Sequence, residues 1–400
     1  MPNQHPEITD LPADKSAETS VKGEASAKEG QPSKPAKTVL AIASAGGHWV
    51  QLLRLRSAFE DHRVVYATTQ EDYRIEVPGE EFHRIPDGTR WDKIKLIRCA
   101  FSILRLILKT KPDVIITTGA APGYFAIRLG RLLGKRTVWI DSIANAEVLS
   151  LSGQKAAKHA TLWLTQWKHL ARDSGPHFYG NVLGDSPSQD HASPDEGQDQ
   201  ASVIDNRGSQ ERAELGLNIP DNEAQIERSE RSPIKSEPKL RIFVTVGSDV
   251  PFDRLIIAID DWAAKTRKPI EIFAQIGNSD YQPKRFEYCK FLSPAEFKDR
   301  LENCDLVAAH TGMGSILSAL RAQKPILTLP RHGALGETRN DHQIATAKHL
   351  LDLGIIDVAS TTDELQEMLE NLKLTPNHHS IPQWASETLT RKLNAFISER

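Results

Sequence analysis

Several features that define common protein classes are scarce or missing in this chain. Among its 400 residues are only three cysteines, Cys99, Cys289 and Cys304. Their spacing suits neither a disulfide framework nor a metal site, which favours a reducing compartment. The formal net charge is −3, so the composition gives no sign of nucleic-acid binding. No apolar run reaches the roughly 18 residues of a membrane span. The first residues lack the apolar core of a signal peptide, so none is expected.

Two long polar stretches divide what remains. Residues 1–37 are rich in Pro, Ser, Lys, Glu and Ala and nearly free of aromatic side chains, which is typical of a disordered tail. Residues 185–238 carry Ser, Asp, Gln and Glu with few large apolar residues. A loop of that length is improbable inside a compact domain, so we expect a disordered linker. The chain is therefore predicted to contain two domains, 38–184 and 239–400.

Both predicted domains alternate short apolar runs with helical segments, which implies parallel sheets covered by helices on both faces. Ligands of such sheets bind at the carboxyl ends of the strands, so the predicted fold is α/β with a cleft between two domains. The expected strands are 39–43, 64–67, 113–117, 137–140 and 162–166, then 241–246, 270–275, 305–309 and 325–329. The expected helices include 49–60, 93–110, 123–133, 294–303, 316–323 and 342–353.

The turn HTGMGS carries the strongest functional signal. It begins at His310, follows the strand 305–309 and leads into a helix. Gly312 and Gly314 allow backbone N–H groups to approach an anion, and the helix N-terminus adds partial positive charge. His310 and Ser315 can donate hydrogen bonds to phosphate oxygens. This unit predicts a site for a nucleotide or another phosphorylated ligand.

Two other strand ends in the second domain carry polar or small residues. Gly247 and Ser248 follow the first strand and are expected to border the cleft. The segment PRHGALGETRNDHQ follows the fourth strand, and its Asp341 and Gln343 offer acceptors and donors for sugar hydroxyls. The alternative is a solvated loop in which an Asn or Asp caps the next helix.

In the first domain, the turn SAGGH follows the first strand directly. Gly46 and Gly47 allow a tight turn, and His48 falls at the start of the next helix. The helix dipole lowers the pKa of an imidazole there, which favours the neutral form that acts as a general base. The alternative is a histidine that serves only as a polar cap.

Two more turns of this domain lie at predicted carboxyl ends. The segment TTGAAPG has Gly119 and Gly123 at positions that suit close approach to a ligand, although a tight turn alone would explain them. Asp141 follows the strand 137–140. It can orient His48, contact a sugar hydroxyl, or simply cap a helix.

The segment 93–110 is apolar over most of its helical circumference. Lys95, Arg98, Arg105 and Lys109 fall on one side at helical spacing. A basic amphipathic helix of this kind can lie in a membrane interface and meet anionic lipid. The alternative is a core helix with a solvated basic stripe.

Taken together, these segments resemble a known family. Residues 239–360, with VTVGSDVPFDRL, HTGMGS, KPILTLPR and ETRNDHQIATA, resemble the nucleotide-sugar-binding half of family 28 glycosyltransferases. Residues 38–184, with SAGGHWVQLLRL, TTGAAPG, WIDSIANAEVLSLSG and LWLTQWKHLA, resemble the membrane-associated acceptor subunit of its two-part members. Such enzymes act in bacterial exopolysaccharide synthesis and asparagine-linked glycosylation. The chain resembles a fusion of the two subunits.

The resemblance implies a GT-B fold with two Rossmann-like domains whose sheets face the cleft. It implies an inverting hexosyltransferase without metal or cofactor, which moves a sugar from a UDP-sugar to a polyprenyl-diphosphate-linked saccharide. Location on the cytoplasmic face of the cell membrane is expected, and other polysaccharide-synthesis proteins are candidate partners. The implied catalytic residues are His48 and Asp141, and the implied acceptor-side residues are Gly46, Gly47, Gly119 and Gly123. The implied donor-binding residues are Gly247, Ser248, His310, Gly312, Gly314, Ser315, Glu337, Asn340, Asp341 and Gln343.

One position departs from the family pattern. Many relatives carry Glu where this chain has Ser318, and that carboxylate grips both ribose hydroxyls. Glu337 is a candidate replacement. Arg331 and Arg339 can pair with a donor carboxylate, which hints at glucuronate, although the sequence does not identify the sugar.

Two other functions remain open at this point. A UDP-sugar 2-epimerase shares the same two-domain fold and needs neither a lipid acceptor nor a membrane. A non-catalytic protein that senses nucleotide sugars and recruits a polymerase is the second, although the intact GGH and NDHQ segments argue against it.

Overall fold

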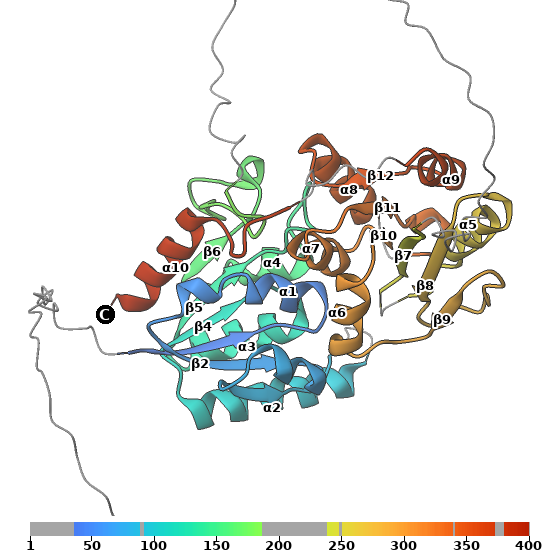
Figure 1. The fold of residues 1–400 in the computed structure, drawn as a ribbon. Helices are drawn as coiled ribbons and strands as arrows, with labels where there is room; N and C mark the ends of the chain where they lie inside the picture. The colour runs from blue at the N-terminus through green and yellow to red at the C-terminus, as the bar shows by residue number, and fades with distance from the viewer. Residues whose placement is uncertain are drawn as a thin grey trace, which may run out of the picture. The chain divides into compact units, whose positions relative to one another are not determined.

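Two parallel β-sheets with their covering helices form the framework of the protein (Figure 1). The computed structural model describes residues 36–88, 92–185, 238–247, 250–338, 341–372 and 380–399. Most of the predicted tail and linker lies outside these ranges, so their disorder stays a prediction.

The first sheet has the strand order β3-β2-β1-β4-β5-β6, and all neighbouring strands run parallel. Its central strands are buried along almost their whole length, as expected for a parallel sheet covered on both faces. The five predicted strands are confirmed, but β3 is hard to recognise because its sequence, EFHR, buries only Phe82. The strands are β1 Thr38–Ile42, β2 Arg63–Thr68, β3 Glu81–Arg84, β4 Val114–Thr117, β5 Arg136–Ile140 and β6 Leu162–Leu164.

The second sheet repeats this design with the order β12-β11-β10-β7-β8-β9, again all parallel. The four predicted strands are confirmed. The edge strands β9 and β12 are too short and polar to be read from the sequence. The predicted fold class, two Rossmann-like domains with parallel sheets, is therefore confirmed. The strands are β7 Leu240–Thr245, β8 Ile270–Gln275, β9 Glu287–Cys289, β10 Leu306–His310, β11 Ile326–Leu329 and β12 Asp357–Val358.

The helices lie close to their predicted positions, with three corrections. α7 begins at Met313 rather than at 316. α1 ends at Leu53 rather than at 60, and a short 3-10 turn, Arg56–Ala58, follows. α3 begins at Ala120 rather than at 123, because Pro122 fits the first turn of a helix. The helices are α1 Gly47–Leu53, α2 Lys93–Thr110, α3 Ala120–Leu132, α4 Leu151–Ala156, α5 Asp253–Lys265, α6 Pro294–Glu302, α7 Met313–Arg321, α8 His342–Asp352, α9 Thr362–Asn371 and α10 Glu387–Ser398.

Capping side chains explain where some of these helices begin. Ser293 and Glu296 form a capping box at α6, with Pro294 in the first turn. Thr361 accepts a hydrogen bond from the Glu364 backbone N–H at the start of α9.

The last helix, α10, packs against the first sheet's domain. The backbone N–H of Ala385 donates to the Arg54 carbonyl at 2.9 Å, and Arg136 forms an ion pair with Glu399 at 2.8 Å. Asn394 donates to the carbonyl of Ala58. The C-terminal part of the predicted domain 239–400 therefore contacts the first domain.

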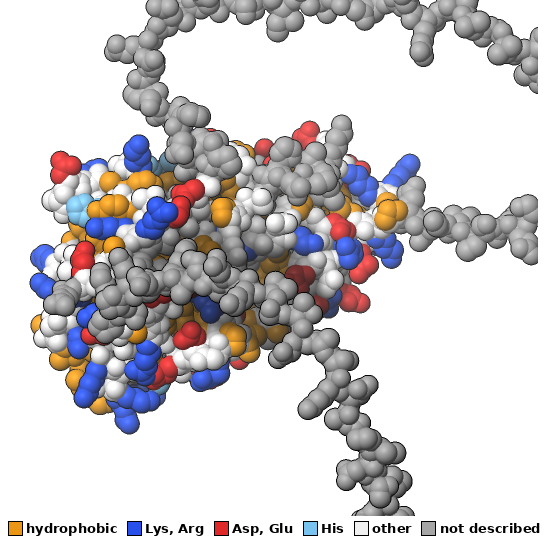
Figure 2. Space-filling view, turned by 60° about the vertical axis from the view of Figure 1, so that its left-hand side comes forward, with side chains coloured by type: hydrophobic (Ala, Val, Ile, Leu, Met, Phe, Trp, Pro, Cys, Tyr) orange, Lys and Arg blue, Asp and Glu red, His pale blue; other side chains and the backbone are white. Residues whose placement is uncertain are grey.

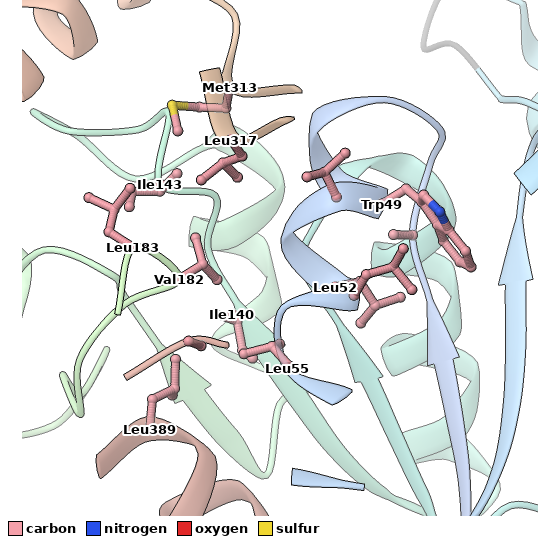
Figure 3. Close-up of a cluster of buried hydrophobic side chains, with 14 of the residues drawn as sticks. Trp49, Leu52, Leu55, Ile140, Ile143, Val182, Leu183, Met313, Leu317 and Leu389 are labelled. Atoms are coloured by element: carbon pink, nitrogen blue, oxygen red, sulfur yellow. The ribbon is translucent and has the colours of Figure 1, made fainter. Parts of the chain in front are cut away.

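One apolar core continues from the first domain into the second. Figure 3 shows Met313 and Leu317 of α7 on the side of Ile143 and Leu183, two residues of the first domain. α1 and α7 are in contact within this core. The two helices that follow the central strands of the two sheets therefore lie side by side.

Arg54 joins its own segment to residues 182–183 and 382–384 through their backbone carbonyls. Its guanidinium donates to the carbonyls of Val182, Leu183, Pro382 and Trp384, and the residue is only 1% exposed. Burial, together with the charge of Arg321, lowers the pKa of Arg54 to about 10.

We expect Arg54→Met to destabilise the protein by about 3 kcal/mol, because it leaves several buried carbonyls without a donor. The matched control is Arg128→Met, at an exposed arginine of α3. Urea denaturation measures both variants. Equal unfolding midpoints for R54M and R128M would show that the Arg54 hydrogen bonds do not hold α10 in place.

Candidate functional site

The glycine turns lie where the strand order of each sheet reverses. β1 and β4 are neighbours at this point in the first sheet, and β7 and β10 are neighbours at the equivalent point in the second. Open α/β sheets bind ligands at such points, beyond the carboxyl ends of the strands. The turns predicted from the sequence follow these four strands.

His48 lies in the first turn of α1 and is held by Thr118, which follows β4. The His48 Nδ1 is 2.9 Å from the Thr118 carbonyl oxygen, and the Thr118 hydroxyl donates to the His48 carbonyl at 2.7 Å. A carbonyl only accepts, so Nδ1 carries the proton and Nε2 keeps its lone pair. A Cβ on Gly119 would lie 2.8 Å from the His48 Cε1, and Gly119 has a φ of +129°. Glycine is therefore required beside this ring.

Burial lowers the pKa of His48 below its usual 6.5, while the Thr118 carbonyl and the Asp141 charge oppose the shift. The ring is therefore neutral at neutral pH. A neutral imidazole with an available Nε2 lone pair is suited to accept a proton.

Asp141 does not make the hydrogen bond that orients His48, which corrects this part of its predicted role. It is 1% exposed, and its carboxylate accepts from the Trp139 indole, the Asn145 amide and both the backbone N–H and hydroxyl of Ser150. These donors occupy both oxygens. Asp141 therefore fixes the loop after β5, and it influences His48 only through its charge.

The predicted acceptor-side glycines differ in backbone conformation and packing. Gly46 has a φ of +73°, and its N–H donates to the Tyr73 hydroxyl. The neighbouring Ala45 N–H donates to the hydroxyl of Thr69. By contrast, Gly123 lies inside α3, where a Cβ would lie 2.1 Å from the Thr117 hydroxyl oxygen. Packing against β4 explains this glycine without a ligand.

His310 ends β10, and its ring lies between two glycines. A Cβ would come within 2.7 Å of the ring at Gly247 and within 2.0 Å of it at Gly312. Burial first, and then the charge of Arg331, lowers the pKa of His310 to about 3. The Nδ1 atom is buried without a hydrogen-bond partner. His310 is therefore neutral, and its one N–H donates to the Thr245 backbone, so it offers an anion neither positive charge nor a spare N–H.

The first turn of α7 contains the other predicted phosphate contacts. Gly312 caps the helix without a side-chain hydrogen bond, and its own N–H donates to the His310 carbonyl at 2.8 Å. The N–H groups of the residues that follow it in the first turn have no intrahelical acceptor. Gly314 and Ser315 follow in this turn, and Ser315 is 7% exposed. A Cβ built on Gly47 would lie 3.2 Å from the Gly314 nitrogen, and one on Gly314 would lie equally close to the Gly47 nitrogen. The two glycine turns therefore touch each other through their backbones.

The loop after β11 is braced by polar contacts that the sequence does not reveal. Both carboxylate oxygens of Glu337 bind Arg254, at 2.8 Å each, and one also accepts from the His332 N–H. Glu337 is thus already engaged, which argues against it as the replacement for the ribose-binding acid. Asp341 accepts from the Gly333 N–H, and the buried Gln343 accepts from the Arg331 N–H.

Arg331 is also engaged within the protein. It is 3% exposed, and its guanidinium donates to the carbonyls of Val246, Val250, Pro251 and Glu337. The suggestion that Arg331 pairs with a donor carboxylate is therefore corrected. Ser248, Arg339 and Asn340 lie outside the described residues.

The described part of the chain contains neither a cluster of metal ligands nor a membrane-spanning helix. Within it, no three His, Cys, Asp or Glu side chains gather as a metal site would require. None of its helices is both long and apolar enough to span a bilayer.

Residues 241–393 match the glycosyltransferase family 28 C-terminal domain. The chain is 28% identical over 167 residues to the UDP-N-acetylglucosamine transferase subunit ALG14 of Mus musculus, a match that spans 33% of this chain and 76% of the relative. The subunit of the same name from Eremothecium gossypii is 26% identical over 170 residues, spanning 34% and 76%.

Solved structures share the fold at low sequence identity. MurG of Acinetobacter baumannii superimposes with a TM-score of 0.50 at 16% identity, covering 92% of this chain and 100% of MurG. A putative UDP-N-acetylglucosamine 2-epimerase from Listeria monocytogenes gives 0.51 at 11% identity, covering 91% of each chain. These similarities support the two-domain GT-B architecture.

The setting of His310 predicts how stability depends on pH. Its folded-state pKa lies below the unfolded value, so the unfolded chain takes up a proton first as the pH falls below about 6.5. Above that pH, His310 does not lower the free energy of unfolding. At lower pH, the free energy of unfolding falls because of His310 by at most about 1.4 kcal/mol per pH unit. Urea denaturation between about pH 7 and 5 should give a flatter dependence for His310→Gln than for the wild type. The control is His177→Gln, at another half-buried histidine. Identical slopes for H310Q and the wild type would refute the assignment.

Proposed function

We propose that the protein is a glycosyltransferase that transfers a hexosyl group from a UDP-sugar to a polyprenyl-diphosphate-linked saccharide. The match of residues 241–393 to the glycosyltransferase family 28 C-terminal domain supports this proposal. One observation carries the proposal. The turn that holds the neutral His48 lies in backbone contact with the open first turn of α7, at Gly47 and Gly314. A candidate base and a candidate diphosphate site therefore lie next to each other.

The donor is assigned to the second domain. Its diphosphate would bind the N–H groups at the start of α7, where Gly312, Gly314 and Ser315 lie. The His310 ring lies against Gly312 of this turn. Asp341 and Gln343, at the start of α8, would bind the sugar, together with Asn340 and the turn at Gly247 and Ser248. The name of the ALG14 relatives, UDP-N-acetylglucosamine transferase subunit, supports a UDP-sugar as donor.

The reaction we propose is a single displacement. The acceptor hydroxyl oxygen forms a bond to the anomeric carbon while the bond from that carbon to the UDP oxygen breaks, which inverts the configuration. The hydroxyl proton passes to the Nε2 of His48. The negative charge that develops on UDP is stabilised by backbone N–H groups and the dipole of α7, without a metal ion.

A lipid acceptor is supported by the outer surface of α2. Ile94, Ile97, Phe101 and Leu108 are between 56% and 72% exposed, although they are large and apolar. Lys95, Arg98, Arg105 and Lys109 are exposed on the same helix. Figure 2 shows basic and hydrophobic side chains next to each other along the lower edge of the described part, where Figure 1 places α2.

An apolar stripe beside a basic stripe suits an interface with anionic lipid. We therefore propose that the protein binds the cytoplasmic face of the cell membrane peripherally and acts in exopolysaccharide or capsule synthesis. A UDP-sugar 2-epimerase remains the second candidate, because the Listeria structure has the same fold. An epimerase has no need of a membrane-facing helix, so α2 favours the transferase.

His48→Ala should lower the rate of sugar transfer by about 10²-fold or more, because it removes the proposed base. UDP-sugar affinity, measured by calorimetry, should stay within about twofold, since the donor site lies in the second domain. In the wild type, kcat/KM should fall only below about pH 6.5, because the lowered pKa keeps His48 unprotonated down to that range.

The matched control for this experiment is His83→Ala, at a surface histidine that contacts Glu81. Its transfer rate should resemble that of the wild type. Transfer by H48A within a few-fold of the wild type would show that His48 is not the base.

Replacement of Phe101 by Glu should weaken binding to vesicles that contain anionic phospholipid by about tenfold, since it puts a charge into the apolar stripe. Leu353→Glu is the control, at an exposed leucine that follows α8. Vesicle co-sedimentation at low and moderate salt measures both variants. Equal binding by F101E and L353E would exclude α2 as the membrane contact.

A further inference from the structure

A buried polar network connects the His48 turn to the ends of two other strands. Its centre is the side chain of Gln51, one helical turn after Gly47 on α1. Gln51 and Gln166 are each 1% exposed, and Ser142 is 5% exposed. Buried amides are costly unless their polar atoms are bonded, so a network at this position requires an explanation.

Every polar group of the Gln51 amide is used. Its nitrogen donates to the Gly47 carbonyl at 3.1 Å and to the Ser142 hydroxyl at 2.9 Å. Its oxygen accepts from the Ile143 N–H at 3.0 Å and from the Gln166 amide at 2.9 Å. The amide therefore has a single favourable orientation.

Gln166 extends the network to two further segments. Its amide nitrogen also donates to the Asp141 carbonyl at 2.9 Å, and its oxygen accepts from the Val182 N–H at 2.9 Å. The network thus joins the turn after β1, the loop after β5 and the segment after β6. These are carboxyl ends of strands in the first sheet, where a ligand would enter.

We propose that Gln51 is a positioning residue for the transfer reaction: it fixes the His48 turn against the loop that begins at Asp141. This inference rests on the proposed function. Gln51 binds the carbonyl of Gly47, the residue directly before His48, so loss of the amide acts on the base first. The donor turn at α7 receives no hydrogen bond from this network. Misplacement of a catalytic group by about 1 Å can lower a rate by about 10²-fold.

The test compares Gln51→Met with the wild type in the full chain. Methionine has nearly the same length and fills the same space, but its thioether cannot replace the four hydrogen bonds. We expect kcat for transfer to fall by on the order of 10²-fold. Affinity for UDP, measured by calorimetry, should stay within about twofold of the wild type.

The pH profile separates positioning from a merely structural role. When the turn relaxes, His48 becomes more exposed, and its pKa should rise towards the ordinary value near 6.5. The acid limb of kcat/KM should then move to higher pH in Q51M. The control, Gln366→Met, loses one hydrogen bond to the Ala258 carbonyl in the second domain and should keep the wild-type limb.

Histidine NMR titration gives a readout that does not depend on activity. A raised His48 pKa in Q51M supports the proposal even if the wild type transfers no sugar, in which case only the proposed function fails. An unchanged His48 pKa in a folded Q51M overturns the proposal. Wild-type kcat in Q51M overturns it as well.

If Q51M does not fold, Gln51→Glu is the second variant, because it keeps the acceptor oxygens for Ile143 and Gln166 and loses the donor to Gly47.

Discussion

The close backbone contact between Gly47 and Gly314 is the constraint on which the proposed active site depends. Each glycine follows a central strand of its sheet, and a Cβ on either one would lie 3.2 Å from the other's nitrogen. The apolar core around α1 and α7 holds this contact in place. Larger side chains here would push the turns apart and separate the proposed base from the proposed diphosphate site.

The two sheets share one topology, but His48 and His310 differ in their hydrogen bonds. The His48 Nδ1–H is bonded to the Thr118 carbonyl, so its Nε2 lone pair remains for a substrate. In His310, Nδ1 is buried without a partner, and the pKa is near 3. The single proton of this neutral ring is donated to the Thr245 backbone. The same side chain at equivalent points of two similar folds thus keeps an available Nε2 lone pair in one domain and a buried, unpartnered Nδ1 in the other.

Local patterns in the sequence predict the strands, most helices and the glycine turns, because each depends on neighbouring residues. The contacts inside the site depend on strand order and register, which no local pattern contains. Thr118 lies 70 positions from His48, and Ser142 lies 91 positions from Gln51. For this reason Asp141 and Glu337 look like free carboxylates in the sequence but are bound by protein donors in the structure. The return of α10 to the first domain is hidden for the same reason.

The most direct test of the proposed transfer uses the full chain with a panel of UDP-sugars and a polyprenyl-diphosphate-linked saccharide in anionic vesicles. Mass spectrometry follows the lipid, and a coupled assay follows UDP. The predicted result is that one UDP-sugar yields UDP together with a lipid heavier by one hexosyl residue, in equal amounts, and that neither forms without the acceptor. Conversion of the UDP-sugar to an epimer in the absence of lipid, or binding of UDP-sugars with no UDP release under any acceptor, would contradict it.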